Sequence, residues 1–122
     1  MRKIKDVKDI CVCEGKIVRD RIPEIIEKEG RVAYVRVLQG DALKLNLKRK
    51  LLEEANEAFE AKNRSKLVEE LVDVIEVVDA IADAYGITRG ELCDTRAEKN
   101  EEKGEFTEGY YLIESFSVLE EV

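Results

Sequence analysis

The sequence predicts a mainly α-helical bundle built on a long antiparallel helix pair, with a few short β-strands. Apolar residues recur at helical spacing over about residues 42–61 and again over about residues 66–85. The polar turn Lys62–Ser65 joins the two segments, and so short a connection makes consecutive helices antiparallel. Both helices carry an apolar stripe that a 122-residue chain with 6% aromatic residues has little other means to cover. We therefore expect a homo-oligomer, in particular a dimer, whose helices share one core.

Shorter elements are expected on the N-terminal side of this pair. A first helix should begin near Asp20–Pro23, because proline fits the first turn of a helix, and should stop at Gly30. The segment 32–38 is rich in β-branched and aromatic residues, which favours a strand. No internal repeat is apparent in the chain.

Capping residues mark the later boundaries. Ser65 is a suitable N-cap for the second long helix, and Gly86 is a suitable stop. Thr88–Glu91 forms a capping box for a further helix that should end at Gly104. Two short strands are expected beyond that helix, at 110–113 and 116–118.

Composition narrows the class of protein. The length suits one domain, 1–122, with residues 1–14 and 114–122 peripheral to it. The formal net charge of −7 and the lack of a basic run argue against binding to a nucleic acid polymer. No apolar stretch approaches the roughly 20 residues that span a bilayer, and the N-terminus lacks the apolar centre of a signal peptide. We expect a cytoplasmic protein that does not bind membranes.

The chain has no histidine and three cysteines, Cys11, Cys13 and Cys93. One Cys-x-Cys pair without histidine is a poor zinc site, so we interpret the cysteines as small reduced side chains. The absence of histidine also removes Ser-His and Cys-His nucleophilic machinery. Proton transfer is left to carboxylates, lysines or a metal-bound water.

Two groups of acids stand out by their positions on the predicted helices. At about 100° per residue, Glu54 lies inside the apolar arc of the first long helix and Glu57 at its edge, whereas Glu53 lies outside it. On the second long helix, Glu70 lies inside the apolar arc and Asp73 borders it. Most glutamates on helices are solvated, so acids within an apolar arc need an explanation.

A metal site is one explanation for these acids. Burying unpaired carboxylates costs several kcal/mol each, so positive charge must lie among them. Two carboxylate pairs facing each other across an antiparallel hairpin supply four hard oxygen ligands, which Mg²⁺ and Mn²⁺ prefer. The alternative is structural, because Lys50 lies one turn from Glu54 and could neutralise it in an interhelical salt bridge. The residues alone leave both explanations open.

The spacing of the acids carries a family resemblance. Glu53-Glu54-x-x-Glu57, followed after 12 residues by Glu70-x-x-Asp73, resembles the EExxE and ExxD signature of MazG-type all-α nucleoside triphosphate pyrophosphohydrolases. The segments Lys16–Ile26, Arg96–Asn100 and Gly104–Phe106 resemble the flanking parts of a small single-domain branch related to phosphoribosyl-ATP pyrophosphohydrolase. The resemblance covers roughly residues 15–113.

The resemblance implies roles for individual residues. Glu54, Glu57, Glu70 and Asp73 would bind Mg²⁺, for which Mn²⁺ could substitute, and the metal would bridge the phosphates of a nucleotide. Glu53 would act as the catalytic base or orient the attacking water. The candidates for substrate binding are Arg19, Lys50, Arg96, Lys99 and Asn100. For the basic residues, ordinary charges at helix ends are the alternative interpretation.

The function expected from these residues is Mg²⁺-dependent hydrolysis of a nucleoside triphosphate, or a related nucleotide, to a monophosphate and pyrophosphate. No glycine-rich phosphate loop is present, so metal ions would have to carry phosphate binding. Two alternatives remain. One is phosphoribosyl-ATP hydrolysis in histidine biosynthesis, and the other is a non-catalytic helical interaction module whose acids are structural.

Overall fold

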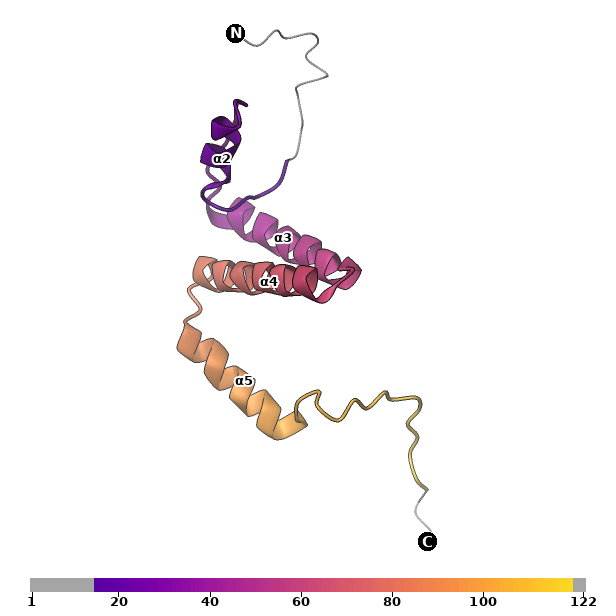
Figure 1. The fold of residues 1–122 in the computed structure, drawn as a ribbon. Helices are drawn as coiled ribbons and strands as arrows, with labels where there is room; N and C mark the ends of the chain where they lie inside the picture. The colour runs from indigo at the N-terminus through magenta and orange to yellow at the C-terminus, as the bar shows by residue number, and fades with distance from the viewer. Residues whose placement is uncertain (1–14, 120–122) are drawn as a thin grey trace. The chain divides into compact units, whose positions relative to one another are not determined.

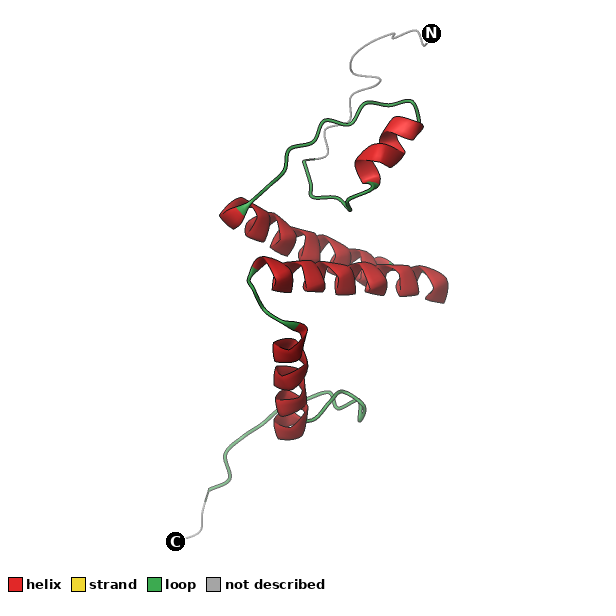
Figure 2. Cartoon of the chain, turned by 90° about the vertical axis from the view of Figure 1, so that its left-hand side faces the viewer, coloured by secondary structure: helices red, strands yellow, loops and turns green. Residues whose placement is uncertain are grey.

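The computed structural model describes residues 15–119, and all regular structure in this range is α-helical (Figures 1 and 2). The mainly α prediction is therefore confirmed. The helices are α2 (Ile22–Lys28), α3 (Gly40–Glu60), α4 (Arg64–Ala84) and α5 (Arg89–Lys103). The predictions for residues 1–14, including Cys11 and Cys13, lie outside the described range, while Cys93 is a free, exposed thiol.

The chain divides into two compact units at the end of α4. The first unit extends to Ile87 and contains α2, α3 and α4, and the second begins at Thr88 and contains α5 and the segment after it. The assignment of 1–122 to one functional domain stays a prediction. None of the helices in the described range is both long and apolar enough to cross a membrane.

Helices α3 and α4 form the antiparallel pair that the sequence predicts. Each has 21 residues, which corresponds to about 30 Å of helix, and residues 61–63 connect them. The ammonium groups of Lys44 and Lys48, near the start of α3, lie 4.8 and 5.0 Å from the ring centroid of Tyr85, which follows the end of α4. The start of one helix therefore meets the end of the other.

Helix α2 begins as expected and α4 begins earlier than expected. Pro23 lies in the first turn of α2, where a missing N–H breaks no helical hydrogen bond. For α4, the prediction of Ser65 as N-cap is wrong. The cap is Asn63, whose side-chain oxygen accepts a hydrogen bond of 2.8 Å from the N–H of Lys66. Asparagine can cap as well as serine, and its earlier position places Ser65 inside the first turn.

The predicted end of α4 and both predicted ends of α5 are confirmed. Gly86 has a φ of 68°, a left-handed conformation that glycine adopts without steric cost, and it follows the last turn of α4. Thr88 Oγ1 accepts a hydrogen bond of 3.1 Å from the N–H of Glu91 and caps α5. Helix α5 ends at Lys103, before Gly104 with a φ of 80°.

The predicted strands are wrong. Segments 32–38, 110–113 and 116–118 are irregular and largely exposed, with Tyr34 97% and Tyr110 91% accessible. Their residues have high β propensity, but a strand requires a partner for its backbone hydrogen bonds, and within residues 15–119 no segment pairs with them.

The core of the hairpin is small. Among the described residues, the buried hydrophobic side chains are Leu47, Val77 and Ala82, all on α3 or α4. Most of the apolar arcs that the sequence predicts to be buried stay accessible in a single copy of the chain. The large exposed apolar side chains on these two helices are Leu45, Leu52, Phe59, Leu67, Val68, Leu71, Val72, Ile75 and Val78.

Candidate metal centre

Two glutamates lie inside the hairpin, as their helical positions predict. Glu54 on α3 and Glu70 on α4 are each only 5% exposed, which makes them the buried charged residues of the described range. The Oε2 atom of each carboxylate is buried and has no hydrogen-bond partner among the described residues. A buried carboxylate oxygen without a partner is costly, so these two atoms indicate a position for a cation.

Further carboxylates surround this buried pair. Glu53, Glu54 and Glu57 each offer an oxygen, and these three oxygens lie within 4.8 Å of one another. Glu54, Glu70 and Asp73 form a second group by the same measure, and Glu54 belongs to both groups. All five predicted acids therefore gather at one place on the hairpin. Such an all-oxygen donor set suits Mg²⁺ or Mn²⁺ and not a soft metal.

The crowding of negative charge raises the pKa of Glu57. A hydrogen bond with the carboxylate of Glu54 raises the pKa of Glu57 to about 7, and loss of hydration and a hydrogen bond with Glu70 add to the effect. A proton on Glu57 thus relieves part of the repulsion when no metal is bound.

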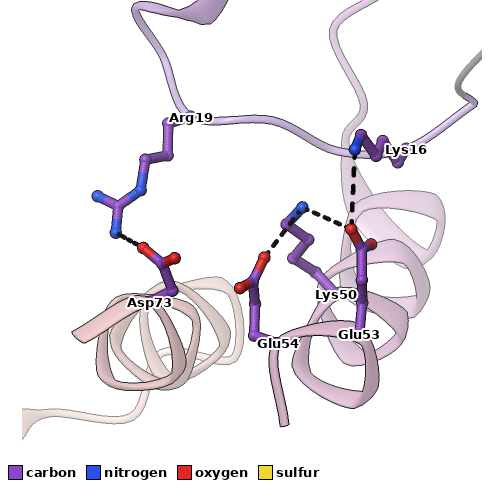
Figure 3. A network of polar contacts seen from close by, with 6 residues as sticks. All are labelled: Lys16, Arg19, Lys50, Glu53, Glu54 and Asp73. Atoms are coloured by element: carbon purple, nitrogen blue, oxygen red, sulfur yellow. Dashed lines mark hydrogen bonds and ion pairs between the residues drawn. The ribbon is translucent and has the colours of Figure 1, made fainter. Parts of the chain in front are cut away.

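Basic side chains partly neutralise the acids (Figure 3). Lys50 Nζ lies 3.2 Å from Glu53 Oε1 and 3.2 Å from Glu54 Oε1, so the salt bridge offered as the structural alternative is present. It forms within α3, at i, i+4, and not between helices as predicted. It occupies one oxygen of Glu54 and leaves Oε2 without a hydrogen-bond partner among the described residues.

Two cations reach the cluster from the segment before α2. Arg19 donates a hydrogen bond of 2.6 Å from its guanidinium to Asp73 Oδ1, and Lys16 Nζ lies 3.8 Å from Glu53 Oε1. Figure 3 shows both side chains directed toward the acids of the hairpin. Arg19 was predicted to bind substrate, whereas Lys16 was not identified as a site residue. Both residues are distant in sequence from the acids that they contact, so no local pattern predicts these contacts.

Lys66 is the other basic residue that the sequence interpretation missed, and here a signal existed. Lys66 Nζ lies 3.4 Å from Glu70 Oε1 at i, i+4, the same spacing as Lys50 and Glu54. Residues 50–57 and 66–73 in fact share the pattern Lys-x-x-Glu-Glu-x-x-acid, a similarity that the sequence interpretation did not use. Because α3 and α4 run antiparallel and Glu54 lies beside Glu70, a two-fold rotation would bring one pattern approximately onto the other, with Glu54 and Glu70 as equivalent residues.

The two ends of this cluster differ. Lys16 and Arg19 contact the acids at Glu53 and Asp73. A shallow hollow of about 520 Å³ adjoins the opposite end, at the α3–α4 connection. It is lined by Glu57, Glu60, Ala61, Lys62, Asn63, Lys66 and Glu70. Arg96, Lys99 and Asn100 belong to α5 in the second unit, and their substrate contacts stay predictions.

Comparisons of the chain with protein-family models, curated proteins and solved structures find no match. The described residues define a small all-α protein of four helices with clusters of acids that could hold a metal ion.

Proposed function

We propose that this chain is a Mg²⁺-dependent nucleotide pyrophosphohydrolase of the MazG type, which converts a nucleoside triphosphate to a monophosphate and pyrophosphate. The observation that carries the proposal is the pair of facing glutamates, Glu54 and Glu70, each buried with one unpartnered oxygen. The spacing of the acids, which resembles the family signature, supports the same assignment.

The donor set fits a hard divalent cation. Glu54, Glu57, Glu70 and Asp73 would hold Mg²⁺ or Mn²⁺, because they offer only oxygens and two of them need positive charge inside the hairpin. When bound, the ion would neutralise the acids and polarise the phosphate oxygens of the substrate. Without it, a protein of net charge −7 has little attraction for a polyphosphate.

The other site residues act on water and substrate. Glu53 would accept the proton of the attacking water, and its contacts with Lys16 and Lys50 hold its carboxylate in place. Arg19 and Lys50 would contact the substrate phosphates from beside the acids. Arg96, Lys99 and Asn100 would add contacts to phosphate or base.

The test is a panel of nucleotides that includes nucleoside triphosphates and phosphoribosyl-ATP, assayed with and without Mg²⁺. Phosphorus NMR should show monophosphate and pyrophosphate as the products. Stepwise release of orthophosphate would reject the cleavage position. A protein that binds neither Mg²⁺ nor Mn²⁺ in calorimetry would instead be a non-catalytic helical module, in which Lys50 and Lys66 are the only neutralising groups needed.

We also propose that a second copy of the chain covers the apolar surface of the hairpin. Leu45, Leu52 and Phe59 recur every seven residues along α3 and are 50%, 72% and 88% exposed, a spacing typical of helix–helix contacts. The exposed apolar residues of α4 add to the surface that a second copy would cover. A two-fold dimer brings the same surface from both copies.

A further inference from the structure

We propose that Arg19 is an exchangeable counter-ion of the metal centre, which holds Asp73 in the metal-free protein and turns to a phosphate group of the ligand once a divalent cation is bound. This inference rests on the proposed function, and it adds an order of events in which metal must bind before Arg19 becomes free for phosphate.

The first argument is that Arg19 and a metal ion compete for the same acid. Arg19 donates to Asp73 Oδ1 at 2.6 Å, and Asp73 shares an oxygen cluster with the two buried glutamates that have unpartnered oxygens. A divalent cation at this cluster would repel the guanidinium and withdraw charge from its carboxylate partner. The ion pair is therefore weaker with metal bound than without it.

The second argument is that the exchange needs only a side-chain rotation. The Arg19 side chain is 52% exposed, so breaking its ion pair with Asp73 costs little. Its backbone is held in place, because the carbonyl of Arg19 accepts a hydrogen bond of 3.0 Å from the N–H of Ile22 at the start of α2. Ile17 and Val18, which precede Arg19, are half-buried. The guanidinium, which Figure 3 shows in contact with Asp73, can thus leave that carboxylate and stay beside the site.

The third argument concerns the ligand. A released guanidinium on a fixed backbone presents several N–H donors next to a metal, which is the arrangement that binds a phosphate oxygen pair. Lys16, on the same segment and 3.8 Å from Glu53, adds positive charge on that side. The chemistry favours a polyphosphate, whose oxygens reach the metal and the arginine together.

The experiment compares wild type with Arg19→Gln, using Mn²⁺ alone and then inorganic pyrophosphate at saturating Mg²⁺, both by calorimetry. Arg19→Gln should bind Mn²⁺ at least about threefold more tightly, because a competing cation is gone. The same variant should bind pyrophosphate at least about tenfold more weakly, because a charge-assisted contact is lost. Neither effect requires turnover.

Arg21→Gln is the matched control. Arg21 is two residues away and exposed, and it makes no ion pair with any residue of the described range, so both affinities should stay within twofold of wild type. Two results overturn the exchange when wild type binds both probes. One is that Arg19→Gln binds Mn²⁺ no more tightly than wild type does. The other is that Arg19→Gln binds pyrophosphate as tightly as wild type does. If wild type itself binds no divalent metal, the proposed function fails before the exchange is reached.

Discussion

Replacing Glu54 by glutamine tests the metal centre most directly, because it removes one charge and preserves the shape of the side chain. Without metal, the carboxylate of Glu54 has oxygens of Glu53, Glu57, Glu70 and Asp73 nearby, in groups whose members lie within 4.8 Å. At about 5 Å and an effective dielectric of 20, each ionised pair repels by about 3 kcal/mol, whereas Lys50 at 3.2 Å attracts by about 5 kcal/mol. Repulsion from four neighbours therefore exceeds the single attraction.

The expected gain in metal-free stability is smaller than these pair energies. Glu53 and Asp73 are partly exposed and have cationic partners, so water and those partners screen their repulsion. We expect Glu54→Gln to raise the free energy of unfolding by about 1–2 kcal/mol at pH 8, which corresponds to roughly 3–8 °C in Tm. The glutamine oxygen can still accept a hydrogen bond from Lys50, so the local contact persists.

The assay measures Tm with and without millimolar Mg²⁺, together with the rate of pyrophosphate release. Mg²⁺ should raise the Tm of wild type more than that of the variant, and the hydrolysis rate should fall by at least about 100-fold. Glu69→Gln is the control, because Glu69 is the equivalent of Glu53 on α4 but its side chain is 68% exposed. If Glu54→Gln lowers metal-free stability and leaves catalysis intact, Glu54 is only the partner of Lys50 and the metal centre is wrong.

Three further predictions concern pH, assembly and capping. The pKa of Glu57 rises from 4.5 to about 7 in the fold, so between these values the folded protein holds a proton that the unfolded chain has released. Metal-free Tm should therefore fall as pH rises from about 4.5 to about 7 and level off above, and Glu57→Gln should show less of this fall. Mn²⁺ affinity should rise over the same range, measured by calorimetry, because the proton competes with the metal. Light scattering should give a molar mass above the 13.9 kDa of one chain, and Phe59→Glu should dissociate or unfold the oligomer. A wild-type monomer at micromolar concentration would refute the shared core. Asn63→Ala should lower stability by about 1 kcal/mol in chemical denaturation while Ser65→Ala changes it less, and the reverse order would reinstate Ser65 as the cap.

The helices and the buried acids could be predicted because both depend on local spacing. A helix places residues at about 100° intervals, so the positions of Glu54 and Glu70 among apolar neighbours were enough to predict their burial. The cap at Asn63 shows the limit of this approach, since Asn63 and Ser65 are both good N-caps and only the path of the connection selects one.

Features that depend on distant parts of the chain could not be predicted in the same way. Segment 32–38 has the composition of a strand, but composition does not supply the neighbouring strand that its backbone would need. The contact of Arg19 with Asp73 joins residues 54 positions apart, and no spacing rule relates them. Lys66 is different, because its relation to Glu70 repeats that of Lys50 to Glu54 and was available in the sequence.

The repeated pattern on α3 and α4 has a consequence for how the site distinguishes the two ends of a ligand. A cluster whose halves are related by two-fold rotation would accept an elongated anion equally well in either direction. The segment before α2 contacts the halves unequally, because Arg19 pairs with Asp73 while the equivalent acid, Glu57, borders the hollow at the helix connection. The two ends of the site are therefore different. A reaction that cleaves at one particular phosphorus atom of a polyphosphate requires such a difference.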